Sequence, residues 1–249
     1  MINHITEDRL YAKLLKQFVA NKHSFLRAYC HYSESLFEKE VERDRELAEM
    51  CGGMEFHPDD PDYDPESPVA FFSQAAEFRK TLRRSNFITV YSLWESQYKY
   101  YAEWMLIADK RRRDPASVPR LRDIKGESVS DRYRTFLVQH IGLSDDQALW
   151  TVLADLAVVR DQIVHGVGEL SPVEIDLTTS ERDEHVIPKH DRLIEVLNKY
   201  EDKGLSMDKP GEFLIDASLI EYLIDTTEEY MADVLTTYVE HLKEPTAVS

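Results

Sequence analysis

The sequence predicts an all-α protein, namely a helical bundle with a partly irregular insertion before its last helix. Only 8 of its 249 residues are glycine, and the good helix formers Leu, Glu, Lys and Arg are abundant. Apolar residues recur every three or four positions through most of the chain, as in helices that face a core. No internal repeat or linker is visible. We therefore expect one domain over residues 1–249, with a bundle core at about 5–50, 69–166 and 216–243 and an insertion at about 167–215.

A first long helix is predicted to run to about Glu49. Leu10, Leu14 and Phe18 follow one another at four-residue spacing and give this helix an apolar face, with charged residues on its outer side. The stretch 55–68, which is rich in proline and aspartate, is predicted to form a surface loop.

A second long helix opens with Ser67 as N-cap and Pro68 at the first helical position, where the missing N–H of proline is not needed. The helix ends before Asp114-Pro115, because proline disfavours helical backbone in the residue that precedes it. Its stripe at helical spacing is mainly aromatic and consists of Phe87, Tyr91, Trp94, Tyr98, Tyr101 and Met105.

Two further helices are predicted in the middle of the chain. Ser130 is expected to cap a short helix that reaches about His140. Ser144, three residues before Gln147, has the pattern of a capping box and opens the next helix, which stops at Gly166. The apolar stripe of that next helix consists of Leu149, Val152, Leu153, Leu156 and Ile163.

The insertion has a different pattern. Apolar and polar residues alternate over 173–177, which predicts a short strand or an extended flap. A turn over 208–211 is expected to join a small hairpin, in which 205–207 pair with 213–215. The final helix is predicted over 217–242, where apolar residues return to helical spacing.

Several classes of protein do not fit the sequence. No apolar run reaches membrane-spanning length, and the N-terminus lacks the apolar stretch of a signal peptide. Cys30 and Cys51 have no metal-ligand spacing and fit free thiols in a reducing cytoplasm. The histidines show no zinc-like spacing, and no glycine-rich phosphate loop is present. We therefore expect a cytoplasmic protein without membrane contact, metal or cofactor.

The net charge of −17 argues against a broadly basic nucleic-acid surface, but the basic residues are segregated. Residues 79–134 carry 14 Lys and Arg against 7 Asp and Glu. This segment is either a solvated helix end and loop or a phosphate-binding patch. For the second case, the candidate RNA-binding residues are Arg111, Arg112, Arg113, Arg120 and Arg122.

The most informative stretch lies at the end of the fourth predicted helix, over residues 160–165. Arg160 falls on the apolar stripe, and a guanidinium that faces a core needs a partner or a polar cleft. Glu95 on the second helix is the candidate partner. His165 can exchange a proton near neutral pH, and a guanidinium donates to phosphate oxygens, so the pair fits acid–base chemistry on a phosphodiester. The alternatives are a helix C-terminal histidine stabilised by the macrodipole and a purely structural Arg160–Glu95 ion pair.

Tyr91–Ser96 and Arg160–Gly166 together resemble the HEPN superfamily. RNA-cleaving members carry an arginine followed, after four to six residues, by a histidine at the end of a bundle helix, and here the gap is four. The residue after the arginine is often Asn, Asp or His, which Asp161 matches, and Glu95 matches a glutamate in the preceding helix. The resemblance covers roughly 70–170 and the final helix. One departure is Val167, where a toxin branch carries a tyrosine that its nucleotidyltransferase partner modifies.

The resemblance implies a metal-independent endoribonuclease, in which the ribose 2′-OH attacks the adjacent phosphate. His165 would then exchange protons, Arg160 would bind the phosphate, Asp161 would orient or stabilise His165, and Glu95 would pair with Arg160. Such an enzyme would act on RNA in prokaryotic defence or as a toxin, with a regulatory or antitoxin protein as a further partner.

Arg160 and His165 lie roughly 140° apart on a regular helix, because five residues span about 500° of rotation. The resemblance implies a solution, a homodimer in which two such motifs form a composite active site across a two-fold axis. The alternative function is a catalytically inactive helical module that binds a protein partner through its acidic surface. The intact Arg160–His165 pair favours the enzyme, and the charge of −17 favours the binding module.

Overall fold

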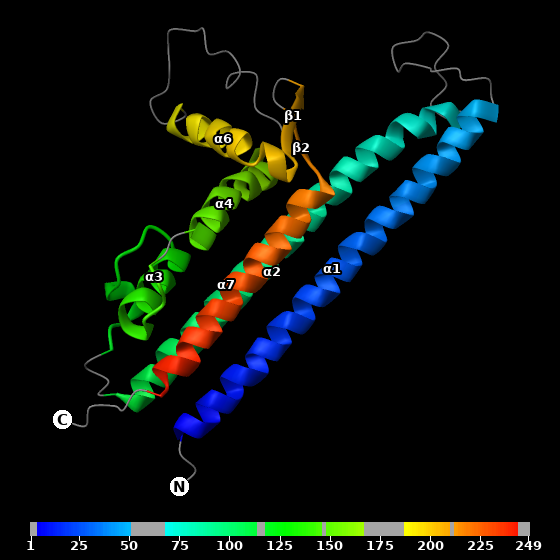
Figure 1. Ribbon diagram of the computed structural model, residues 1–249. Helices are drawn as coiled ribbons and strands as arrows, with labels where there is room; N and C mark the ends of the chain where they lie inside the picture. Colours follow the sequence, from blue (N-terminus) through cyan, green and yellow to red (C-terminus); the bar gives the residue numbers. More distant parts are fainter. Residues whose placement is uncertain are drawn as a thin grey trace. The chain divides into compact units, whose positions relative to one another are not determined.

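The structure is a computed structural model, and it describes residues 4–50, 68–113, 118–145, 148–166, 187–209 and 212–243. Nearly all of these residues are helical (Figure 1), so the predicted all-α class is confirmed. In this described part of the chain, none of the helices combines the length and apolarity that a membrane crossing requires. The helices are α1 (His4–Met50), α2 (Pro68–Arg112), α3 (Val129–Phe136), α4 (Ala148–Gly166), α6 (Ile187–Lys199) and α7 (Ala217–His241).

The bounds of the three longest helices, α1, α2 and α7, agree with the predictions. α2 begins at Pro68, as the preference of proline for the first helical turn requires, and it ends at Arg112. The predicted loop at 55–67, the cap at Ser67 and the Asp114-Pro115 stop lie outside the described residues.

α1 corrects one prediction, because it carries apolar residues on two sides. Leu10, Leu14 and Phe18, which predicted the apolar face of this helix, are exposed. The side chains that α1 buries are Ala12, Leu15, Val19, Leu26 and Cys30. Both sets have helical spacing, and a shift of one residue turns a helix by about 100°, so periodicity alone did not distinguish the core face.

The cap of α3 is a second correction. The N-cap is Ser128, two residues before the predicted Ser130. The Ser128 Oγ accepts a hydrogen bond from the backbone N–H of Asp131 at 3.1 Å, and the Asp131 carboxylate accepts one from the Ser128 N–H at 2.9 Å. Because Asp131 stands three residues after Ser128, both bonds of a capping box can form there.

α3 continues into a π-helical turn, η2 (Leu137–Ile141), which is close to the predicted end at His140. Gly142 ends it with a left-handed φ of 87°, and the Leu143 N–H donates to the Leu137 carbonyl at 3.0 Å. The capping box predicted at Ser144 includes Gln147, which lies outside the described residues.

The predicted hairpin is present as β1 (Leu205–Lys209) and β2 (Glu212–Ile215), with Leu205 opposite Ile215. A 3-10 turn, η3 (Glu201–Lys203), precedes it, and another, η1 (Leu121–Asp123), precedes α3. The alternating stretch at 173–177 lies outside the described residues. α6 was not predicted, although its buried residues Leu193, Val196 and Leu197 have clear helical spacing.

The chain divides into two compact units, both assembled from several stretches of sequence. Unit 1 comprises Met1–Phe25, Thr89–Ala157 and Leu223–Ser249, and unit 2 comprises Leu26–Ile88 and Val158–Tyr222. The helices α1, α2, α4 and α7 each contribute residues to both units. The organisation as one domain stays a prediction.

Unit 1 has an aromatic core. Trp94 and Tyr98 stack with ring centroids 5.7 Å apart, and Tyr230 and Trp150 lie at 5.8 Å from each other. Such contacts bury a large apolar area and add specific ring geometry. The first part of α1 lies alongside α7 in this unit (Figure 1), and the buried His23 Nε2 is 3.1 Å from the Thr227 hydroxyl.

Unit 2 has a mainly aliphatic core. α6 packs against β1 of the hairpin, and Leu193 and Val196 of α6 and Leu205 of β1 are buried. Gly204 has a φ of 96°, and its carbonyl accepts a hydrogen bond from the Asp216 N–H at 2.8 Å, which ties the hairpin to the start of α7. This scaffold carries the end of α4, on which the predicted catalytic residues lie.

Candidate active site

The motif helix α4 buries an apolar face, but Arg160 is at its edge rather than at its centre. Leu156, Val159 and Ile163 are buried, so the position that faces the core belongs to Val159. The Arg160 side chain is 27% exposed. The side chain is therefore exposed in part, although the Nε of its guanidinium is buried.

Arg160 forms an ion pair with its neighbour in sequence. The Arg160 Nε lies 3.1 Å from the Asp161 Oδ1, and the Asp161 side chain is 58% exposed. An exposed carboxylate beside a guanidinium holds its orientation while contributing little to stability. The structure thus brings together two of the four predicted catalytic residues.

His165 lies in the last turn of α4, one residue before the terminal Gly166, and its side chain is exposed. An exposed ring at that position can accept and release protons from a substrate. His165 is therefore accessible, as a proton-transferring residue must be.

Glu95 belongs to unit 1, whereas Arg160, Asp161 and His165 belong to unit 2. The Glu95 carboxylate accepts a hydrogen bond from the Lys99 ammonium at 2.9 Å and lies 3.5 Å from the Ser130 hydroxyl. The pairing of Glu95 with Arg160 stays a prediction, because the two residues lie in different units.

The five predicted RNA-binding arginines, all in unit 1, fall into two groups. Arg111 and Arg120 are exposed, and the Arg122 side chain is 71% exposed. Arg112 is only 4% exposed, and its nearest guanidinium nitrogen lies 3.9 Å from the buried carboxylate of Asp109. Arg113 is also directed at Asp109, at 3.2 Å. Burial removes Arg112 from the side chains that can bind RNA from solvent.

Asp109 is the centre of a buried polar cluster that sequence analysis did not identify. Its Oδ1 lies 3.0 Å from the Nε2 of His241, and both side chains are almost completely buried. The signal was present, because Asp109 follows Met105 by four residues and so lies on the apolar stripe of α2. Its partner, however, is 132 residues away, which no local pattern reveals.

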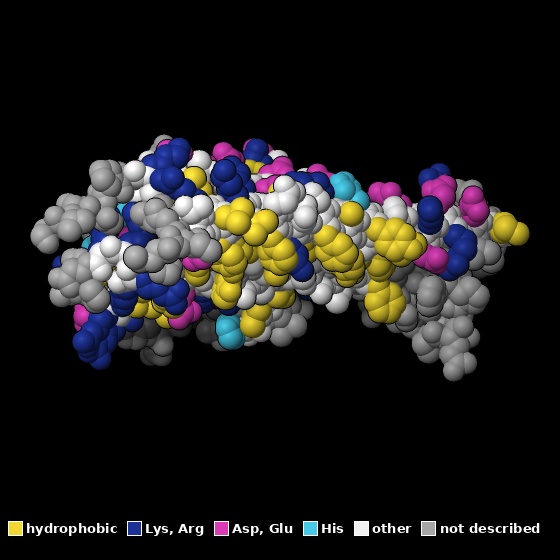
Figure 2. Space-filling view, turned by 90° about the horizontal axis from the view of Figure 1, so that it is seen from below, with side chains coloured by type: hydrophobic (Ala, Val, Ile, Leu, Met, Phe, Trp, Pro, Cys, Tyr) yellow, Lys and Arg dark blue, Asp and Glu magenta, His cyan; other side chains and the backbone are white. Residues whose placement is uncertain are grey.

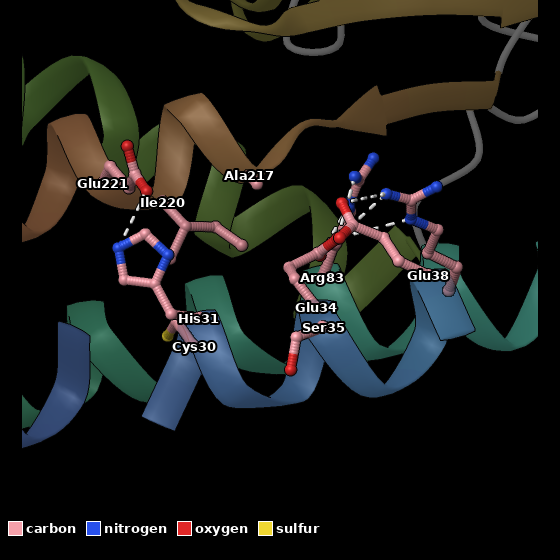
Figure 3. A pocket seen from close by; sticks show the side chains of 10 residues that line it. Cys30, His31, Glu34, Ser35, Glu38, Arg83, Ala217, Ile220 and Glu221 are labelled. Atoms are coloured by element: carbon pink, nitrogen blue, oxygen red, sulfur yellow. Dashed lines mark hydrogen bonds and ion pairs between the residues drawn. The ribbon is translucent and has the colours of Figure 1, made fainter. Parts of the chain in front are cut away.

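A second unpredicted cluster lines a cavity of about 380 Å³ in unit 2 (Figure 3). Arg83 on α2 donates to both oxygens of the Glu34 carboxylate on α1, at 2.7 and 3.0 Å. Arg79 donates to the same carboxylate at 3.1 Å, and Arg83 also donates to Asp216 at 2.8 Å. This ion-pair network connects α1, α2 and the start of α7 within unit 2.

The network shifts the ionisation of its members. Burial alone would raise the pKa of Glu34, but hydrogen bonds and charges from Arg83 and Arg79 outweigh burial and lower the pKa. The hydrogen bonds from Arg83 to Glu34 in turn raise the pKa of Arg83. Burial raises the pKa of the Cys30 thiol in the same cavity to about 11, so this cysteine is not a nucleophile at neutral pH.

Comparison of the chain with protein-family models, with curated proteins and with solved structures gave no match. The functional argument therefore depends on the residues and on their placement.

Proposed function

We propose that the chain is a metal-independent endoribonuclease of the HEPN type, whose reacting groups lie at the end of α4. The observation that carries the proposal is the placement of His165 and Arg160. Both lie in the last two turns of one helix, where the His165 side chain is exposed and the Arg160 side chain is 27% exposed. A helix with this motif sealed inside the core could not reach a phosphodiester.

The chemistry that fits these groups is transesterification. The ribose 2′-oxygen attacks the adjacent phosphorus and loses its proton to a base, and an acid protonates the 5′-oxygen that leaves. The products are a 2′,3′-cyclic phosphate and a 5′-hydroxyl. A neutral His165 can act as the base and a protonated one as the acid, while Arg160 donates hydrogen bonds to the charged phosphoryl oxygens.

This reaction uses one acid and one base, and the motif of each chain supplies one histidine, His165. The rotation of roughly 140° between Arg160 and His165 also keeps them from addressing one phosphate from a single regular helix. A composite site in a symmetric homodimer resolves both points, because a two-fold axis brings a second copy of each residue. The exposure of His165 and Asp161 is compatible with such a site.

RNA is held, in this proposal, by the exposed basic side chains Arg111, Arg120 and Arg122, which neutralise backbone phosphates. Arg113 contributes less, because its guanidinium faces Asp109, and Arg112 contributes through the fold alone. A short basic segment on an acidic protein favours a narrow RNA path over wide non-specific binding. The biological setting that we propose is prokaryotic defence or toxicity, with a regulatory or antitoxin protein as partner.

The test is cleavage of a fluorescent single-stranded RNA by purified protein. We expect His165→Ala to lower the rate by about 10²–10⁴-fold, which is what positioned acid–base catalysis contributes. Arg160→Ala should also abolish cleavage, and EDTA should leave the wild type active.

His31→Ala is the matched control, because His31 is likewise an exposed histidine, 63% exposed and 3.2 Å from Glu221. It should cleave at the wild-type rate, and thermal melts should show all variants folded. Full activity of folded His165→Ala would remove the catalytic role. The second candidate, a catalytically inactive module that binds a protein partner, would then stand on the net charge of −17.

A further inference from the structure

The buried polar cluster around Asp109 contains hydrogen-bonding atoms that the surrounding side chains do not satisfy. Hydrophobic side chains are visible on the surface in Figure 2, whereas the charged side chains of this cluster lie inside unit 1. Among the described residues, the Asp109 Oδ2 and the Arg112 Nε and Nη1 are shielded from solvent and have no hydrogen-bond partner, and the same is true of the Tyr238 hydroxyl. Because nearly all buried polar groups in proteins are hydrogen-bonded, these atoms indicate a bound polar ligand.

The unsatisfied atoms come from α2 and α7 within unit 1. Asp109 and Arg112 lie three residues apart on α2, so they share one face of the helix. The Arg112 Nη1 is 3.9 Å from the Asp109 Oδ1, which is too far for a direct hydrogen bond. Burial raises the pKa of the Tyr238 hydroxyl on α7, the charge of Arg112 lowers it, and the charge of Asp109 raises it, so both charges lie near this hydroxyl.

The two oxygens of the Asp109 carboxylate have different surroundings. Oδ1 lies 3.0 Å from the His241 Nε2 and 3.2 Å from the Arg113 Nε, so protein groups contact it directly. Oδ2 is just as buried but has no partner among the described residues. The Asp109–Arg112 pair therefore has a gap of 3.9 Å, with unused hydrogen-bonding atoms on both sides of it.

The chemistry of these atoms selects water as the ligand. An anion could accept from Arg112 but would be repelled by Asp109, and a metal cation could bind Asp109 but would be repelled by Arg112. Water accepts one hydrogen bond from a guanidinium and donates another to a carboxylate. Two such bonds of about 2.9 Å bridge groups that are about 4–5 Å apart. Buried waters typically make about three hydrogen bonds to groups that are otherwise unsatisfied.

We infer that a buried water molecule is a fixed part of unit 1, bound by Asp109, Arg112 and Tyr238. The water accepts a hydrogen bond from the Arg112 guanidinium and donates one to the Asp109 Oδ2, and its second proton is shared with the Tyr238 oxygen. It turns the 3.9 Å gap into a bridged ion pair and connects α2 to α7. The inference goes beyond the proposed function, because no step of RNA cleavage depends on this water.

A crystal structure of the wild-type protein, at a resolution that shows ordered waters, tests the position of the ligand. We expect a density peak within hydrogen-bonding distance of the Asp109 Oδ2, an Arg112 nitrogen and the Tyr238 oxygen. A direct hydrogen bond between the Asp109 Oδ2 and Arg112, or a site without density, would overturn the inference. Crystals soaked in bromide distinguish water from an anion, because an anomalous peak at this site would assign an anion there and overturn the inference too.

In solution, magnetic relaxation dispersion of the water oxygen counts the water molecules that stay bound for longer than the protein takes to tumble. Arg112→Met removes the guanidinium donors and keeps most of the side-chain length, so the count should fall by one. Arg113→Met is the matched control, because the Arg113 guanidinium contacts the Asp109 Oδ1 directly, and it should keep the wild-type count. An unchanged count in folded Arg112→Met would overturn the inference.

Tyr238→Phe is a milder variant that keeps the ring and removes only the hydroxyl, so it tests the site even if Arg112→Met does not fold. Loss of one hydrogen bond should shorten the residence time of the water by about 2–10-fold. Tyr98→Phe is its control, because the buried Tyr98 hydroxyl donates directly to the Ser130 carbonyl at 3.3 Å, and it should leave the residence time unchanged. A residence time in Tyr238→Phe equal to that of the wild type would also overturn the inference.

Discussion

Asp109 lies at the centre of a buried polar cluster at one end of unit 1. Its carboxylate is fully buried and lies within 3.2 Å of both His241 and Arg113. Buried polar and charged groups are costly unless they are hydrogen-bonded or paired, so each member of this cluster needs the others. The cluster therefore links the C-terminal ends of α2 and α7 by charge.

Asp109→Asn should lower the free energy of unfolding by about 3–5 kcal/mol, because it breaks a buried ion pair from one side. Asp123→Asn is the control, since Asp123 is 59% exposed and 3.7 Å from Arg122, and it should change stability by less than about 1 kcal/mol. Urea-induced unfolding measures both. Equal effects of the two substitutions would mean that the buried cluster is not stabilising.

Glu34 makes stability depend on pH. Its pKa is lowered in the folded protein, so its contribution to stability is complete above the unfolded-state pKa and is lost as pH falls through the folded-state value. The difference in Tm between wild type and Glu34→Gln should be constant above about pH 5 and should shrink below about pH 4. Glu38→Gln, at a residue 67% exposed, should show a small difference at every pH. A difference that grows in acid would contradict the predicted sign.

At the scale of an element, the hairpin depends on Gly204. Its φ of 96° is unfavourable for other residues, and an added Cβ would overlap the Ser218 hydroxyl and lie 2.8 Å from the Asp216 Cβ. Gly142 also has a left-handed φ, of 87°, but an added Cβ there meets no atom within 4 Å.

Gly204→Ala should therefore destabilise the protein more than Gly142→Ala does. The cost of placing alanine at a left-handed φ is common to both variants and amounts to about 1 kcal/mol. Only Gly204→Ala adds the overlap with Ser218 and Asp216. Thermal denaturation of the two variants measures the difference. If Gly142→Ala were the more destabilised variant, packing around the hairpin would be looser than the structure indicates.

The bounds of the helices were easier to predict from the sequence than the contacts that the helices make. The bounds of α2 follow from Pro68 and from a regular aromatic stripe, both of which are local. The choice between Ser128 and Ser130 as N-cap depended on Asp131, and the core face of α1 depended on which of two periodic sets was buried. α6 was missed because its flanking segments gave no helix signal.

In the candidate site too, features set by local sequence could be predicted and features set by distant contacts could not. The accessible position of His165 follows from the end of the helix at Gly166, which is a local signal. The burial of Arg112 does not follow from a local signal, because it depends on Asp109 and on His241 at the far end of the chain. Pairing between residues distant in sequence is set by tertiary packing, which no single-sequence pattern encodes.

At the scale of the whole molecule, charge segregation predicts how RNA binding responds to salt. Each neutralised phosphate of a single strand contributes about 0.7 to the slope of log K against log salt concentration. Replacing Arg111, Arg120 and Arg122 together by Ala should reduce that slope by about 2. Fluorescence anisotropy with labelled RNA measures the slope.

The matched control replaces three other exposed arginines, Arg43, Arg45 and Arg192, and so changes the net charge equally. Its slope should stay close to that of the wild type. Equal slopes in both triple variants would mean that total charge, and not the basic segment, governs binding.

The division of the chain into two units has a consequence for how this protein can be altered. Neither unit is a continuous stretch of sequence, and four helices pass from one unit into the other. A gene fragment that encodes one unit alone therefore does not exist. A chimaera that exchanges one unit therefore needs several separate replacements along the gene.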